Sequence, residues 1–181
     1  MRLILSVLLC CAAGCSRAAV EPADDALPAI APAAESRAAP QATRKIQQFR
    51  GRGVISIADR PNSPTIALEL ARTDSERQQG LMFRQSMQND HGMLFFMPYD
   101  NDWVFYMRNT YIRLDMVFID SAWRVVGVVE NTSPLTEDHR SVGADSRYVL
   151  ELTAHTAGKL GIRAGTQLVY EPRPDVAAPT P

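Results

Sequence analysis

The sequence predicts an α+β domain that is mostly β: a small curled sheet or barrel of about eight short strands with two short helices. Three observations predict this class. Short runs rich in aromatic and β-branched residues recur along the chain. In one of them, large apolar residues alternate with smaller or charged ones, which is typical of a half-buried strand. Helix-start signals occur at only two places, so we expect few helices.

The N-terminal segment, residues 1–15, has the composition of an export signal. "MRLILSVLLCCAAGC" carries one early Arg, a short apolar run and then small residues, and it is too short to span a bilayer. The small residues before Cys15 resemble the bacterial lipoprotein signal, in which the cysteine becomes the acylated N-terminus. We therefore expect an envelope lipoprotein that faces the periplasm and is bound to the membrane through acylated Cys15. The alternative is plain secretion after cleavage near Ala13. If Cys15 is acylated, Ser16 next to it favours transport of the lipoprotein to the outer membrane.

The next segment, residues 16–46, is rich in Ala and Pro and reads as a linker. Repeated Pro blocks long helices, and the segment has too few bulky apolar residues to build a core. Residues 173–181 have a similar composition and are predicted to form a disordered tail. The globular domain is therefore expected to span residues 47–172.

Charge and cysteine content exclude several classes of function. The formal net charge is −1 and no basic cluster is present, so we expect no nucleic-acid partner. The three cysteines are Cys10, Cys11 and Cys15, all within the signal segment. The folded domain therefore has no thiol for a disulfide, a nucleophile or a zinc ligand. No cofactor is expected.

Strand signals fill most of the globular segment. "VISIA" (54–58) and "TIALELA" (65–71) flank the turn-rich "DRPNSP". In the second run, Ile66, Leu68 and Leu70 alternate with the residues between them, as expected for a half-buried strand. The further predicted strands are 92–97, 103–108, 114–120, 123–130, 148–153 and 167–171.

Two short helices are predicted from their end signals. "TDSE" fits a capping box in which Thr73 and Glu76 bond reciprocally, and Gly80 can follow the end of this helix. For the second helix, within "AHTAGKL", Thr153 is the expected N-terminal cap and Gly161 the residue after its end.

Four segments carry a family signature: "ERQQGLMFR" (76–84), "GMLFFM" (92–97), "WVFYMRNTYIRLDMVFID" (103–120) and "YVLELTAHTAGKLGIRAGTQL" (148–168). In this order they resemble the bacterial and archaeal family called domain of unknown function 192, also named uncharacterised protein family 0127. The resemblance covers roughly residues 65–170. It implies a small, mostly β domain, often exported or membrane-tethered, with no established activity. Two residues depart from the family pattern: His155 stands where a Gly is usual, and Thr166 where an acidic residue is common.

The segment 103–120 is predicted to form a hairpin. If 103–109 pairs with 114–120, Arg108 faces Asp115 on one side of the sheet. In this register Val104 and Tyr106 point with Arg108, whereas Trp103, Phe105 and Met107 point the other way. Apolar residues occur on both faces, so both are expected to be largely buried. A buried Arg requires a carboxylate partner, and two interpretations remain open: a structural ion pair, or an anion clamp oriented by Asp115.

The ligand interpretation predicts a set of binding residues. Arg77 and Arg84 would converge on Arg108 if the first helix packs near the hairpin. The predicted ligand-binding residues are Arg84, Arg108, Asn109, Thr110 and Asp115. The leading interpretation is a non-catalytic binding module for a small anionic or sugar-like ligand or a protein partner.

Two alternatives remain. The polar residues of the 130–139 segment could assemble an acid–base site of a hydrolase-like enzyme, although no known catalytic motif is present and no catalytic residue is assigned. Methionines crowd one part of the chain, and thioethers select Cu(I). They also fill irregular cores. These residues are Met82, Met87, Met93, Met97, Met107 and Met116.

Overall fold

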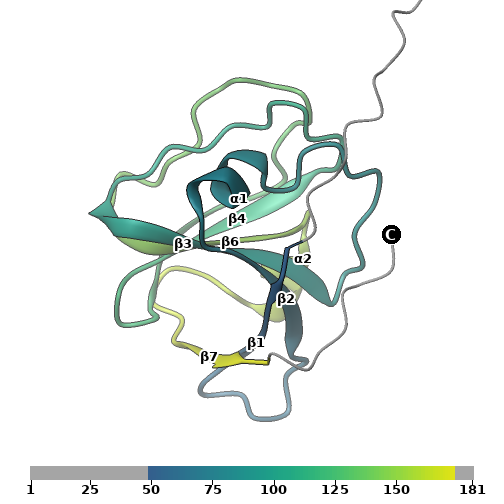
Figure 1. The fold of residues 1–181 in the computed structure, drawn as a ribbon. Coiled ribbons are helices and arrows are strands. Elements are labelled where there is room, and N and C mark those ends of the chain that lie inside the picture. Colours follow the sequence, from purple (N-terminus) through teal and green to yellow (C-terminus); the bar gives the residue numbers. More distant parts are fainter. Residues whose placement is uncertain (1–48, 174–181) are drawn as a thin grey trace, which may run out of the picture. The chain divides into compact units, whose positions relative to one another are not determined.

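A single mixed sheet organises the computed structural model, which describes residues 49–173 (Figure 1). The predicted signal peptide, the linker and all but the first residue of the predicted tail lie outside these residues. The strands are β1 (Gly51–Ile57), β2 (Ile66–Ala71), β3 (His91–Asn101), β4 (Leu114–Ile119), β5 (Val125–Val129), β6 (Ser146–Thr153) and β7 (Leu168–Pro172). Their order is β5-β4-β6-β3-β2-β1-β7, and only β2 and β3 run parallel. No helix of the described part is long and apolar enough to cross a membrane.

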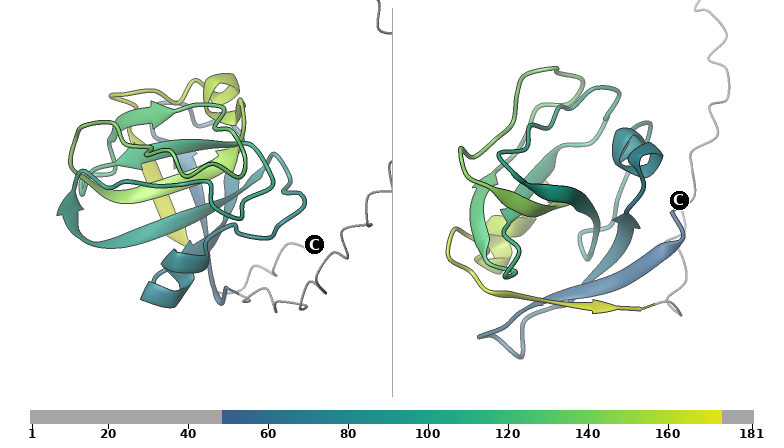
Figure 2. Two further views of the ribbon diagram at one scale, coloured as in Figure 1. Left: turned by 90° about the horizontal axis from the view of Figure 1, so that it is seen from above. Right: turned by 60° about the vertical axis from the view of Figure 1, so that its left-hand side comes forward.

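The sheet curls into a half-barrel, so the predicted fold class is confirmed (Figure 2). Its two ends approach each other, because the Val125 N–H donates to the Thr166 carbonyl at 2.9 Å and the Leu168 N–H donates to the Trp123 carbonyl at 2.9 Å. The Trp123 ring stacks on both Tyr148 and Tyr170, with centroid distances of 4.1 and 5.0 Å. Backbone bonds and ring stacking therefore hold the curl together.

Each face of the sheet carries its own apolar core. The concave-face core takes residues from all seven strands, which include Ile55, Leu94, Val117, Leu150 and Leu168. The convex-face core contains Met93, Phe95, Met116, Phe118 and Val149, together with residues of the loops, which include Leu81, Phe105 and Met107. The central strand β4 is buried along its whole length. Long loops thus form a second layer over the convex face.

Helix α1 (Asp74–Gln79) begins as predicted. The Thr73 hydroxyl accepts the Glu76 N–H at 3.2 Å, and the Glu76 carboxylate accepts the Thr73 N–H at 2.9 Å. This capping box satisfies two N–H groups that have no partner within the helix. Gly80 follows the helix with a φ of 45°.

Helix α2 (Thr156–Leu160) ends as predicted but begins differently. Gly161 has a φ of 67°, and the Ile162 N–H returns to the Ala157 carbonyl at 2.9 Å. The predicted Thr153 cap is wrong, because the Thr153 hydroxyl bonds Asn89 and Thr156 instead. His155 occupies the N-cap position with a φ of 66° and makes no side-chain cap.

Replacing His155 with Gly is expected to raise the free energy of unfolding by about 1 kcal/mol. A non-glycine residue in the left-handed region carries a steric cost that Gly avoids, and this exceeds the entropy that Gly adds to the unfolded chain. Urea unfolding followed by circular dichroism measures the change. An unfolding free energy at or below that of the parent protein would contradict the steric explanation.

Candidate functional site

The predicted hairpin of residues 103–120 does not form. Residues 103–108 are not a strand, and their one ladder contact is an isolated bridge between Phe105 and Arg140. Strand β4 pairs with β5 on one side and β6 on the other. Both of its edges are therefore occupied, which leaves no edge for the 103–109 segment.

The predicted alternation of side chains in this segment is nevertheless present. Phe105 and Met107 point into the convex-face core, whereas Val104, Tyr106 and Arg108 are exposed. Half of the Tyr106 surface is accessible, as is 68% of the Arg108 side chain. The expectation that both faces are buried is wrong, because no further layer of residues 49–173 covers the loop layer. We call the exposed side, Val104, Tyr106 and Arg108, the 104–108 face.

A second segment, residues 136–140, runs beside the 104–108 face. The Met107 N–H donates to the Thr136 carbonyl at 3.0 Å. Side chains of the two segments also meet. The Arg108 Nε lies 3.6 Å from the Glu137 carboxylate, and the Tyr106 ring contacts the His139 ring edge-on, with the centroids 5.5 Å apart. Backbone bonds and side-chain contacts thus join the 104–108 face to the 136–140 segment.

Asp115 does not pair with Arg108. It is fully buried on the concave side, where one carboxylate oxygen accepts the Asn131 N–H and the other accepts the Ala157 N–H, each at 2.9 Å. Ala157 lies in the first turn of α2, so Asp115 supplies the cap that Thr153 was predicted to give. Asp115 therefore has a structural role at the start of α2, and its predicted contact with a ligand stays a prediction. Its predicted ion pair with Arg108 is wrong.

Arg84 is held by Glu69 of β2. Its two terminal nitrogens lie 2.5 and 2.6 Å from the two oxygens of that carboxylate, which is the two-pronged geometry of a strong ion pair. Arg77 is directed elsewhere: its guanidinium donates to the Arg72 and Phe96 carbonyls and pairs with Asp74. The predicted convergence of three arginines is therefore wrong.

Asn109 and Thr110 form the turn next to the 104–108 face. Thr110 is buried, and its carbonyl accepts the Leu135 N–H at 3.1 Å. Asn109 has a φ of 55°, and its carbonyl accepts the Phe83 N–H at 2.8 Å. These two residues therefore join three loops. Whether they contact a ligand stays a prediction.

Glu151 is the residue that sequence reasoning missed. It lies on β6 opposite Met93 of β3 and Met116 of β4, with 5% of its surface accessible. Its carboxyl group has no hydrogen bond or ion pair with any described residue. Burial alone raises the pKa of Glu151 from its ordinary value of 4.5 to about 8. The available signal was a Glu in the otherwise apolar "YVLEL".

The residues of the two alternative interpretations, the polar loop and the methionine cluster, lie in different surroundings. In the polar loop, Glu137 meets Arg108, Asp138 pairs with Arg140, and His139 contacts Tyr106. No hydrogen bond joins these acids to His139 within residues 49–173, and the acid–base interpretation of this loop stays a prediction. Five of the six clustered methionines belong to the convex-face core or pack against it: Met87, Met93, Met97, Met107 and Met116.

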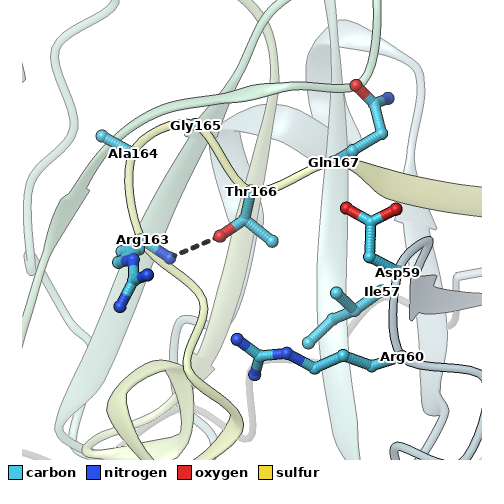
Figure 3. Close-up of a pocket in the computed structure, with 8 residues that line it drawn as sticks. All are labelled: Ile57, Asp59, Arg60, Arg163, Ala164, Gly165, Thr166 and Gln167. Carbon is cyan, nitrogen blue, oxygen red and sulfur yellow. Dashed lines mark hydrogen bonds between the residues drawn. The ribbon is translucent and has the colours of Figure 1, made fainter.

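A hollow of about 300 Å³ lies elsewhere, between the β1–β2 connection and the loop after α2 (Figure 3). Asp59, Arg60 and Arg163 line it with exposed side chains of both charges. The Arg60 guanidinium donates to the Leu160 carbonyl at 2.7 Å, and the Thr166 hydroxyl accepts the Arg163 N–H at 3.0 Å. These bonds fix the loop, and they give Thr166 a structural role where the family commonly has an acid.

Comparisons with known proteins agree with this fold. The family model DUF192, described as "Uncharacterized ACR", matches residues 55–170. A crystal structure described as a putative transcription regulator from Sinorhizobium meliloti 1021 has 37% sequence identity to this chain. The match covers 66% of this chain and 92% of that protein, with a TM-score of 0.61. A protein of unknown function from Novosphingobium aromaticivorans is 31% identical, with coverages of 65% and 83% and a TM-score of 0.58. The comparison with curated proteins finds no match. The chain therefore belongs to the DUF192 family of uncharacterised proteins.

Proposed function

We propose that this protein is a lipid-tethered, non-catalytic binding module of the bacterial envelope, and that it recognises a protein partner with the 104–108 face. The observation that carries the proposal is the exposure of Tyr106 and Arg108 on a loop layer whose inner side chains are buried. Tyr and Arg are the residue types that contribute most to protein interfaces. Tyr111 and Leu135, which are also exposed, lie on the adjoining loops.

The backbone behind this face favours recognition without large rearrangement. Phe105 and Met107 anchor the segment in the core, and reciprocal bonds of 2.9 Å join the backbones of Phe105 and Arg140. A preorganised surface loses little entropy on binding, which favours affinity.

A protein partner fits the charges better than a small anionic or sugar-like ligand does. Glu69 already neutralises Arg84, and Glu137 lies beside Arg108, so these two predicted ligand-binding arginines each have an acidic partner. The regulator description of the Sinorhizobium meliloti protein is also disfavoured for this chain. Its formal net charge is −1, and its N-terminal segment has the composition of an export signal.

Site-specific photo-crosslinking in cells tests the proposal. A benzophenone amino acid at position 106 is expected to give a discrete protein adduct, because interface side chains lie within contact distance of the partner. The matched control is position 169 on β7, where Val169 is similarly exposed but lies on another element. Adding Arg108→Ala should reduce the adduct several-fold, since interface Arg residues are frequent hot spots. Equal adducts at both positions, or none at position 106, would refute the protein-partner assignment.

The tether has its own measurement in the same cells. Incorporation of radioactive palmitate is expected for the parent chain and should be lost on Cys15→Ser, because that thiol is the predicted acylation site. Labelling that survives Cys15→Ser, or no labelling of the parent chain, would reject lipidation without bearing on the 104–108 face.

A further inference from the structure

One row of side chains crosses the convex face of the sheet beneath the loop layer. Glu69 of β2, Met93 of β3, Glu151 of β6 and Met116 of β4 stand opposite one another in register. Directly opposed residues of antiparallel strands have their Cβ atoms about 5 Å apart on the same face. Met93 and Met116 therefore flank Glu151 on the two neighbouring strands.

The two carboxyl groups of this row differ in their partners. Arg84 binds both oxygens of Glu69, whereas the Glu151 carboxyl group has no hydrogen-bond or ion-pair partner among residues 49–173. Met93 and Met116 are completely buried, and Glu151 is 5% exposed. A mostly buried carboxyl group without a protein partner is costly unless water or an ion satisfies it.

We propose that Met93, Glu151 and Met116 form a binding site for one soft monovalent cation of the Cu(I) class. The charge of the site favours a monovalent ion. One carboxylate and one monovalent cation together carry no net charge, so the occupied site holds no net buried charge.

The same reasoning disfavours other ions. A divalent ion would leave a net positive charge on a face that already holds Arg84 and the buried Arg52, which lies opposite Glu69 on β1. Hard ions such as Ca²⁺ and Mg²⁺ require six or more oxygen ligands, counting water, and this row offers one carboxylate beside two sulfurs. Thioethers select Cu(I) among the common metal ions.

The other clustered methionines lie outside this row, and one of them provides a control. Met87 and Met97 are half-buried and pack against the same core. Met107 is engaged elsewhere, because the Thr132 hydroxyl donates to its sulfur at 3.2 Å. Met82 lies outside the row, with its sulfur 3.9 Å from the Asn109 amide nitrogen, and provides a matched control.

Silver(I) titration of the purified full chain tests the site, since Ag(I) is a soft monovalent ion that does not change its oxidation state in air. Cys10, Cys11 and Cys15 are replaced by Ser so that no thiol competes. With ¹³C-methyl methionine, the methyl signals of Met93 and Met116 are expected to shift and saturate at one equivalent. The Met82 signal should stay in place. This readout needs no variant in the core.

Variants then measure the affinity. The double change Met93→Leu with Met116→Leu, and separately Glu151→Gln, are each expected to weaken Ag(I) binding at least about tenfold, or about 1.4 kcal/mol. Met82→Leu should bind as the parent does. Failure of Ag(I) to bind, shifts confined to other methionines, or unchanged affinity in folded Glu151→Gln protein would overturn the proposal. None of these results bears on the 104–108 face.

Discussion

Replacing Asp115 with Asn is expected to lower the free energy of unfolding by about 3 kcal/mol. The carboxylate accepts one N–H on each oxygen, from Asn131 and Ala157, in a site with no water access. Asn has one oxygen and one NH₂ group, so one N–H would lose its acceptor and face a donor. A buried N–H without a partner costs free energy. Urea unfolding monitored by tryptophan fluorescence measures the change.

Asp120 provides a matched control for this experiment. It also accepts two backbone N–H groups at 2.9 Å, from Ala122 and Arg124, but in an exposed turn. Water can replace the lost bond there, so Asp120→Asn should cost only about 1 kcal/mol. Equal losses in the two variants would contradict the assignment of burial as the cause. Faster hydrogen exchange at Ala157 in Asp115→Asn would locate the effect at the start of α2.

Local signals in the sequence predicted local structure well. The Thr73 capping box and the Gly161 end of α2 each depend on residues within a few positions of one another, so the sequence pattern contains the whole interaction. The alternation of Val104, Tyr106 and Arg108 with Phe105 and Met107 also held, although the segment is not a strand.

Interactions across the chain could not be predicted in the same way. Asp115 bonds a residue 42 positions away, and nothing near Asp115 indicates that α2 begins beside it. The hairpin prediction assumed that neighbouring segments pair, whereas β6 takes that edge of β4. Arg108 therefore does not pair with Asp115 as predicted. It is exposed beside Glu137 and belongs to the 104–108 face.

Glu151 shows the same limit for a candidate site. A Glu in a strand normally faces water, so the single Glu of the apolar "YVLEL" was too weak a signal to predict a buried carboxyl group. Its burial arises because the loop layer covers the convex face, and that layer is assembled from segments far apart in the sequence. Only the fold reveals that this carboxyl group has no partner among the described residues.

In the metal-free protein, the free energy of unfolding is expected to fall on the order of 1 kcal/mol for each pH unit between pH 4.5 and pH 8 because of Glu151. Burial raises the pKa of Glu151 to about 8 in the folded protein, whereas the unfolded chain releases the proton near the ordinary value of 4.5. The folded state therefore binds more protons than the unfolded state in this window, and rising pH favours unfolding. The contribution is full below pH 4.5 and is lost by about pH 8.

Glu151→Gln separates this effect from all other titrations. Gln is nearly isosteric and stays neutral, so the variant should match the parent near pH 5 and exceed its stability by several kcal/mol near pH 8. Urea unfolding at a series of pH values measures both proteins. Glu130→Gln, which removes an exposed carboxylate, should retain the slope of the parent. A constant difference between Glu151→Gln and the parent at all pH values would show that Glu151 ionises normally in the folded state, which requires water or a cationic partner at its carboxyl group.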